Sequence, residues 1–308
     1  MEPWQSRFGC RFYCLYRICS ICELLMNKGY LVIAQNSNYD YVRMAYALAL
    51  SITNTQKSVR RISIAVDKET IVPDKYKTVF DQVIEMPFDD DAQLADWKIN
   101  NKWKYYHMTP YQHTVILDTD MLFLSDVGHW WDYFSNRSLT STSQVRTYRN
   151  EIANNSPNRQ TFLANKLPNI YTAFFHFNKN SDLTEEYFKL VEHIFRNYDT
   201  FKEDFMVPPR QTFLSADVVY ALAGKILGIG DEICNKHLEY PTFVHMKSNV
   251  QGWGQGYSKN WTKHIGAYFS KDCDLKIGNY KQTLPFHYQD KEFLTDEIIV
   301  KLEKKIGL

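Results

Sequence analysis

The chain has 308 residues, of which 44% are hydrophobic and 23% charged, and its net charge is +1. This composition is typical of a folded globular protein. Because the net charge is close to zero, no global field would draw the protein to nucleic acid or a membrane, and a polyanionic partner would need a local basic patch.

The first 25 residues differ in composition from the rest. They hold four of the six cysteines, which are Cys10, Cys14, Cys19 and Cys22. This spacing matches no standard zinc pattern, and three arginines interrupt any apolar run that could serve as a signal or membrane span. We therefore expect residues 1–25 to be a non-core appendage, such as upstream nucleotide sequence read through to an in-frame Met26. The body has two lone cysteines and no signal, which predicts a cytoplasmic protein.

The first half of the body alternates strand-like and helix-like segments. Short apolar runs bounded by turn residues predict strands at 30–35, 61–67, 82–87 and 114–118. Helical spacing of apolar residues predicts a helix after Asn38 or Asp40, either of which could be its N-cap, and a second helix over 91–107. This order predicts an α/β fold with a mostly parallel, Rossmann-like sheet flanked by helices.

The second half is less regular. Residues 136–169 are polar and lack a sustained period, so they are expected to form a long loop region. Patterns further along predict strands at 169–177 and 241–247 and helices at 182–198, 215–227 and 295–306, the last with Thr295 as N-cap. Neither a dinucleotide fingerprint nor a P-loop is present, so a bound nucleotide would need its phosphates neutralised by other means.

Two aspartates interrupt the apolar stretch "TVILDTDMLFL". Asp118 and Asp120 are two residues apart, so in a strand their side chains would point to the same face. They follow a buried run and should lie at the carboxyl edge of the sheet, where α/β proteins bind ligands. Two adjacent carboxylates repel each other unless a divalent cation such as Mg²⁺ or Mn²⁺ neutralises them. The alternative is that one caps a turn and the other is solvated.

The segment "VILDTDMLFLSDV" resembles the D-x-D strand of GT-A glycosyltransferases, especially the glycogenin-like retaining families. The resemblance covers residues 30 to 290 and implies one GT-A domain at 26–308. Its nucleotide-binding half would be 26–135, and its acceptor half would be 136–308, ending in a segment that contacts the metal and the diphosphate. It further implies that Asp118 and Asp120 hold Mn²⁺ or Mg²⁺ against the diphosphate of a sugar nucleotide such as a UDP-sugar.

The resemblance also implies donor-binding residues at matching positions. These are Ala34, Gln35, Asn36, Tyr39 or Tyr41 after the first strand, Lys98 and Lys102 before the D-x-D, Thr119 within it, and Thr172 and Ala173 in "NIYTAFF". The last two stand where the family has serine and glycine, so that match is positional. A solvated helix face is the alternative reading of the two lysines. Asp217 occupies the place of the acidic motif that opens a helix and faces the sugar.

A histidine near the C-terminus completes the metal site in the family and is followed by a lysine. "FVHMKSNVQGWGQG" offers His245 and Lys247, but departs from the family in spacing and lacks its K-P-W. His287 in "PFHY" is the competitor for the same role. An ordinary core histidine is the remaining interpretation of either residue.

The acceptor is open at this point. The sequence over longer stretches, including "WKINNKWKYYHMTPY" and "PTFVHMKS", resembles uncharacterised phage proteins. These are related to enzymes that glucosylate hydroxymethylated DNA bases. The stretch 144–169 interleaves basic side chains with aromatic ones, namely Arg146, Arg149, Arg159, Lys166, Tyr148 and Phe162, which suits either a DNA groove or a solvated loop. A glycan, lipid or protein acceptor is the alternative. A nucleotidyltransferase or a non-catalytic binding module is the third reading, although "AQNSNYDY" lacks the glycine-rich basic loop of nucleotidyltransferases.

Overall fold

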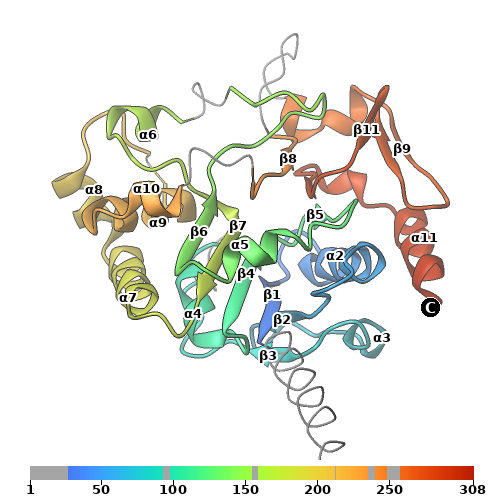
Figure 1. Ribbon diagram of the computed structural model, residues 1–308, viewed down its shortest axis with the longest axis horizontal. Helices are drawn as coiled ribbons and strands as arrows, with labels where there is room; N and C mark the ends of the chain where they lie inside the picture. Colours follow the sequence, from blue (N-terminus) through green and yellow to red (C-terminus); the bar gives the residue numbers. More distant parts are fainter. Residues whose placement is uncertain (1–26, 93–97, 155–158, 212, 235–239, 248–256) are drawn as a thin grey trace, which may run out of the picture.

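The computed structural model describes residues 27–92, 98–154, 159–211, 213–234, 240–247 and 257–308, which are coloured in Figure 1. A mixed sheet lies at the centre, with strand order β3-β2-β1-β4-β7-β6. Its strands are β1 (Lys28–Ile33), β2 (Ile62–Val66), β3 (Val83–Glu85), β4 (His113–Leu117), β6 (Leu139–Thr142) and β7 (Tyr171–Asn178). Strands β1 to β4 are parallel, whereas β7 runs antiparallel to β4 and β6. The predicted α/β fold is confirmed.

Helices cover both faces of this sheet (Figure 1). Val115 and Leu117 pack in the cluster that holds α2 (Tyr41–Thr55) and α5 (Trp130–Phe134). Ile116 points to the opposite face, toward α7 (Asp182–Arg196) and α9 (Ala216–Ile226). This alternation is the period of two expected of a strand buried on both sides. The residues that follow the carboxyl ends of β1, β2 and β4 include Asn36, Asp67 and Asp118, all of which are at least partly exposed.

Two small sheets and a terminal helix complete the arrangement. One sheet joins β9 (Ala267–Phe269), β10 (Leu275–Ile277) and β11 (Tyr280–Gln282), and the other joins β5 (Met121–Leu122), β12 (Phe286–His287) and β8 (Val244–His245). Helix α11 (Asp296–Ile306) packs against α2. The shorter helices are α3 (Asp74–Lys77), α4 (Tyr105–Met108), α6 (Gln160–Ala164), α8 (Tyr198–Phe205) and α10 (Gly230–Ile233).

Two predicted helix caps are confirmed. The Asp40 carboxylate accepts a hydrogen bond from the Arg43 backbone N at 2.9 Å, and Thr295 Oγ1 accepts one from Ile298 N at 3.4 Å. Such caps satisfy backbone N–H groups that have no partner inside the helix.

The predicted helix over 91–107 is wrong. Its described residues form turns, a 3₁₀ turn at Lys102–Lys104 and α4. The side chain of Asn101 donates to Asp90 at 2.5 Å, and the indole of Trp103 donates to Asp91 at 2.8 Å. These side-chain bonds compete with a regular helix.

The predicted loop over 136–169 is wrong in part, because it contains β6 and α6. Strand β6 is wholly buried although it reads Leu-Thr-Ser-Thr. Because three of its four residues are polar, the sequence shows no apolar pattern that would predict a strand. Residues 1–25 lie outside the described residues. One sheet runs through both predicted halves of the body, since β4 pairs with β7.

Candidate active site

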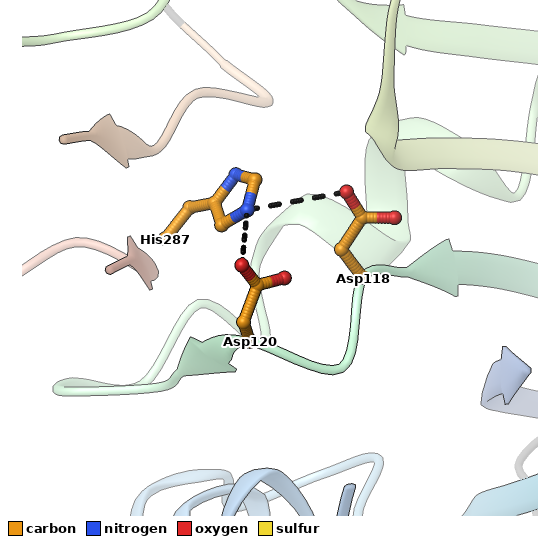
Figure 2. A group of neighbouring side chains, drawn as sticks. All are labelled: Asp118, Asp120 and His287. Carbon is orange, nitrogen blue, oxygen red and sulfur yellow. Dashed lines mark ion pairs between the residues drawn. The ribbon is translucent and has the colours of Figure 1, made fainter. Parts of the chain in front are cut away.

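The paired aspartates lie in the turn between β4 and β5. Asp118 follows the last residue of β4, and Asp120 precedes the first residue of β5. The expectation that both sit in one strand is therefore wrong, but the turn brings their carboxylates together. Oxygen atoms of both, and a ring nitrogen of His287, all lie within 4.8 Å of one another, as Figure 2 shows.

Strand pairing decides which histidine joins the aspartates. β12 lies between β5 and β8, so that His287 is paired with Met121 on one side and with His245 on the other. His287 Nε2 is 3.1 Å from Asp120 Oδ2 and 4.0 Å from Asp118 Oδ2. His245 is one strand further away, and its ring centroid lies 5.0 Å from that of His287. The structure thus groups His287 with the aspartates and places His245 behind it.

Each aspartate also has a lysine partner. Lys102 Nζ donates to Asp118 Oδ1 at 2.6 Å, and Lys291 Nζ donates to Asp120 Oδ2. Burial alone would raise the pKa of Asp120, but the charges of His287 and Lys291 outweigh it and hold the pKa well below its usual range. Burial lowers the pKa of Lys102, yet Asp118 reverses this effect and the net pKa is raised. Lys102 and Asp120 are therefore charged at neutral pH.

Asp217 belongs to the same site. It lies in the first turn of α9, and its Oδ1 accepts hydrogen bonds from Thr172 N at 2.9 Å and Thr172 Oγ1 at 2.7 Å. Its Oδ2 accepts one from Arg159 at 2.7 Å. Burial would raise the pKa of Asp217, but Arg159, Thr172 and Lys102 lower it below the ordinary value. Thr172 directly precedes Ala173, whose backbone oxygen accepts from Asp118 N at 3.2 Å, so Asp217 lies at the start of β7, next to the end of β4.

The antiparallel pairing of β4 and β7 explains the positions of Thr172 and Ala173. Because β7 begins where β4 ends, Asp118 N donates to Ala173 O at 3.2 Å. The predicted positional match of these two residues therefore lies next to the aspartates. Thr119 is buried in the turn, with 6% of its surface exposed.

The residues after β1 have different environments. Ala34 is fully buried, and Gln35 is held by Asp67 at 2.7 Å and Asn101 at 2.7 Å, so neither offers its side chain at the surface. Asn36 is exposed and its Oδ1 accepts from Val42 N at 3.1 Å.

Two aromatic residues follow Asn36. Tyr39 is 48% exposed. The ring of Tyr41 lies 5.7 Å from Lys291 Nζ, which brings this residue to the aspartate pair.

A cavity of about 350 Å³ opens at the carboxyl ends of β1 and β2. Asn36, Asp67, Glu69, Asp90 and Lys98 contribute to its lining. Lys98 Nζ donates to Ala92 O at 2.8 Å, so Lys98 and Lys102, although close in sequence, serve different parts of the site.

Lys247 is exposed two residues after His245. Burial is the main reason that the pKa of His245 is far below its ordinary value, and the charges of His287, Lys247 and Arg159 add to the effect. His245 is therefore a neutral imidazole at physiological pH.

The donor set of Asp118, Asp120 and His287 fits a divalent cation. Two carboxylates and one imidazole suit Mn²⁺ and Mg²⁺, which favour oxygen ligands and tolerate a nitrogen. The imidazole presents Nε2 to the carboxylates, while its buried Nδ1 has no hydrogen-bond partner among the described residues. A metal ion at this point would be bound by three protein side chains.

Two functional residues escaped the sequence analysis. Lys291 stands four residues after His287 in "HYQDK", and that proximity was its only signal. Arg159 was expected in either a DNA groove or a solvated loop, but its side chain is 10% exposed and paired with Asp217. Tyr148 and Phe162, the predicted stacking faces, are also buried, with 5% and 7% exposed, so that part of the groove prediction is wrong.

No protein-family description matches the chain, and no curated protein matches it either. Solved structures that resemble it include the glycosyltransferase GlyE of Streptococcus pneumoniae, with a TM-score of 0.46 and 11% identity over 91% of this chain and 61% of that chain. Mouse xyloside xylosyltransferase 1 has a TM-score of 0.41 and 10% identity over 64% of this chain and 81% of that chain. The galactosyltransferase LgtC, solved with donor and acceptor sugar analogs, has a TM-score of 0.40 and 10% identity over 63% and 70%. The functional assignment therefore depends on the geometry of the site.

Within the described residues, no helix combines the length and the apolar character needed to cross a bilayer.

Proposed function

We propose that the chain is a metal-dependent GT-A glycosyltransferase that moves a hexose from a nucleotide sugar, such as a UDP-sugar, to a hydroxyl acceptor. The observation that carries the proposal is the convergence of Asp118, Asp120 and His287 at the carboxyl edge of the sheet. Lys102 donates to Asp118, and Asp217 accepts from Thr172, the residue before the Ala173 that bonds to Asp118. A site of this type neutralises a diphosphate and leaves a carboxylate facing the sugar.

The distribution of charge indicates how the nucleotide-sugar donor would be oriented in the site. The cavity after β1 and β2 carries Asp67, Glu69 and Asp90 but only one lysine, so it repels phosphate and suits the hydroxyl groups of a nucleoside. Lys102 and Lys291 are the cations at the aspartate pair, and they suit the diphosphate. The nucleoside is therefore expected in the cavity and the diphosphate at the turn between β4 and β5.

The reaction breaks the bond between the anomeric carbon and the leaving diphosphate oxygen. It forms a bond from that carbon to the acceptor hydroxyl oxygen, whose proton passes to the leaving diphosphate or to solvent. A bound Mn²⁺ or Mg²⁺ would supply Lewis-acid stabilisation of that oxygen. The ammonium groups of Lys102 and Lys291 add positive charge where negative charge develops. Asp217 accepts a hydrogen bond from a sugar hydroxyl and stabilises the electron-poor ring.

We further propose retention of anomeric configuration. The resemblance of the D-x-D segment to retaining families supports it. Product analysis by proton NMR during turnover, before mutarotation, tests it: an inverted anomer would contradict this part of the proposal.

A hydroxyl on a glycan, lipid or protein is favoured as acceptor over a hydroxymethylated base of phage DNA. The supporting observation is that Tyr148 and Phe162 are buried and Arg159 is paired with Asp217, which removes three members of the expected DNA groove. A duplex-binding assay at low salt distinguishes the two, because a DNA acceptor requires measurable, salt-dependent binding.

A thermal-shift panel of sugar nucleotides, with and without Mn²⁺, tests the main proposal. One UDP-sugar should stabilise the protein only when metal is present, by mass action on the folded state. Asp118→Asn and Asp120→Asn should each abolish this stabilisation. A wild-type protein that no sugar nucleotide stabilises, or an Asp120→Asn variant with full metal-dependent hydrolysis of the donor, would refute the proposal.

A further inference from the structure

The guanidinium of Arg159 is fixed by two aromatic rings and a backbone carbonyl. Its guanidinium carbon lies 3.7 Å from the ring centroid of Tyr171 and 4.1 Å from that of Phe162. Both terminal nitrogens donate to the backbone oxygen of Ile170 at 3.0 Å. The side chain is 10% exposed, so solvent screens it little. A guanidinium fixed by two rings and a carbonyl has lost its rotational freedom before any ligand binds.

The guanidinium of Arg159 also donates to Asp217. One of its nitrogens donates to Asp217 Oδ2 at 2.7 Å, while Thr172 occupies Oδ1 with two hydrogen bonds. A carboxylate oxygen has two lone-pair directions, so Oδ2 keeps one for a further donor. The Asp217 side chain is 30% exposed. The three donors together fix both the rotamer and the ionised state of Asp217.

We propose that Arg159 is a positioning residue that holds the Asp217 carboxylate in the orientation that receives a hydroxyl group of the donor sugar. This inference rests on the proposed function, because it requires that Asp217 contact the sugar. Arg159 acts through Asp217 and does not itself contact the nucleotide. A carboxylate bound by three donors is also a weak base and a weak nucleophile, so Asp217 works as a fixed hydrogen-bond acceptor.

A double-mutant cycle with two ligands tests the proposal by binding. Calorimetry compares a UDP-sugar with UDP, both with Mn²⁺, for wild type, Arg159→Gln, Asp217→Asn and the double variant. Each single substitution should weaken the UDP-sugar roughly tenfold, the size of one charged hydrogen bond, and leave UDP within about twofold. The double variant should lose no more than the worse single variant, since both changes remove one interaction.

A matched control separates positioning from general packing. Arg196 also stacks on a ring, 4.6 Å from Trp103, and also pairs with a carboxylate, 2.9 Å from Glu192. Arg196→Gln should leave both affinities unchanged. If Arg159→Gln does not fold, Thr172→Val removes one of the two Thr172 bonds to Asp217 at nearly constant volume and should give a smaller loss confined to the UDP-sugar.

Additive losses in the double variant would overturn the inference, and so would an equal loss for UDP and the UDP-sugar. A wild-type protein that binds no sugar nucleotide in the thermal-shift panel would defeat the proposed function first, and the role of Arg159 with it. Normal UDP-sugar binding in the wild type with an unaffected Arg159→Gln variant would defeat the inference alone.

Discussion

The choice between His287 and His245 as metal ligand can be tested by replacing each with phenylalanine. Phenylalanine keeps an aromatic ring, somewhat larger than imidazole, and removes the ring nitrogens that could bind the metal. His287 Nε2 faces the carboxylates at 3.1 Å and 4.0 Å, whereas the ring centroid of His245 lies 5.0 Å from that of His287. The two residues are paired across adjacent strands, so general loosening of β8 and β12 would affect both variants alike.

The expected losses of Mn²⁺ affinity in the two variants differ enough to be told apart by titration. Loss of an outer-shell partner typically costs 10–100-fold in metal affinity, and loss of a direct ligand costs at least as much as the upper end. His287→Phe should therefore weaken Mn²⁺ binding by roughly 100-fold or more, which is about 2.7 kcal/mol. His245 contacts the ring of His287 at a centroid distance of 5.0 Å, and the buried Nδ1 of His287 has no hydrogen-bond partner among the described residues. His245→Phe should therefore weaken Mn²⁺ binding by about tenfold, the lower end of that range.

Electron paramagnetic resonance of free Mn²⁺ during titration measures both affinities directly, without a donor or an acceptor. Circular dichroism melts establish that each variant is folded. A loss for His245→Phe equal to or greater than that for His287→Phe would refute the assignment of His287 and restore the ligand favoured by the sequence.

Three further substitutions test other contacts in the structure. Lys291→Met removes a cation from the metal-site carboxylate, so Mn²⁺ affinity should rise while UDP affinity falls, both by calorimetry; losses in both would contradict the assigned role. Burial, aided by the charge of Lys28, lowers the pKa of His113 from 6.5 to about 4. The unfolded chain then binds the proton more tightly, so about 3 kcal/mol of stability present above pH 6.5 should be lost as the pH falls to 4, and His113→Gln should flatten this slope in urea titrations. In Gly29→Ala the new Cβ would lie 2.5 Å from the buried ring of Tyr111, which predicts a loss of about 1–3 kcal/mol, against less than about 0.5 kcal/mol for Gly266→Ala, where no atom lies within 4 Å.

Local patterns explain which elements the sequence could predict. β1, β4, α7 and α11 combine a clear hydrophobic period with turn residues or caps at their ends, and each was predicted within a few residues of its observed bounds. The failed helix over 91–107 contains Asn101, whose side chain bonds to residues at 35 and 90. Those partners are distant in sequence, so no local period could reveal them.

The candidate site shows the same limit. The D-x-D pair could be predicted because its two members are adjacent in sequence and interrupt an apolar run. His287 reaches Asp120 through β5 and β12, strands of two residues each that carry no recognisable pattern. Arg159 finds Asp217 across 58 residues of sequence, and from sequence alone its polar surroundings read as a loop. Pairing over such distances depends on the folded sheet and not on local composition.

The site contains three carboxylates at one sheet edge, and each has its own cation. Lys102 forms an ion pair with Asp118, Lys291 with Asp120 and Arg159 with Asp217. Unpaired, three buried or half-buried carboxylates would repel one another and destabilise the fold by several kcal/mol.

The three cations are not equivalent. Arg159 is fixed by Tyr171, Phe162 and Ile170, so it stays with its partner. The two lysines end in single ammonium groups on flexible stems, and under the proposed function these would turn toward the diphosphate when a divalent cation binds their carboxylates. The same pairing that makes the ligand-free protein stable would then leave Asp217 fixed for the sugar and Lys102 and Lys291 available for the leaving group.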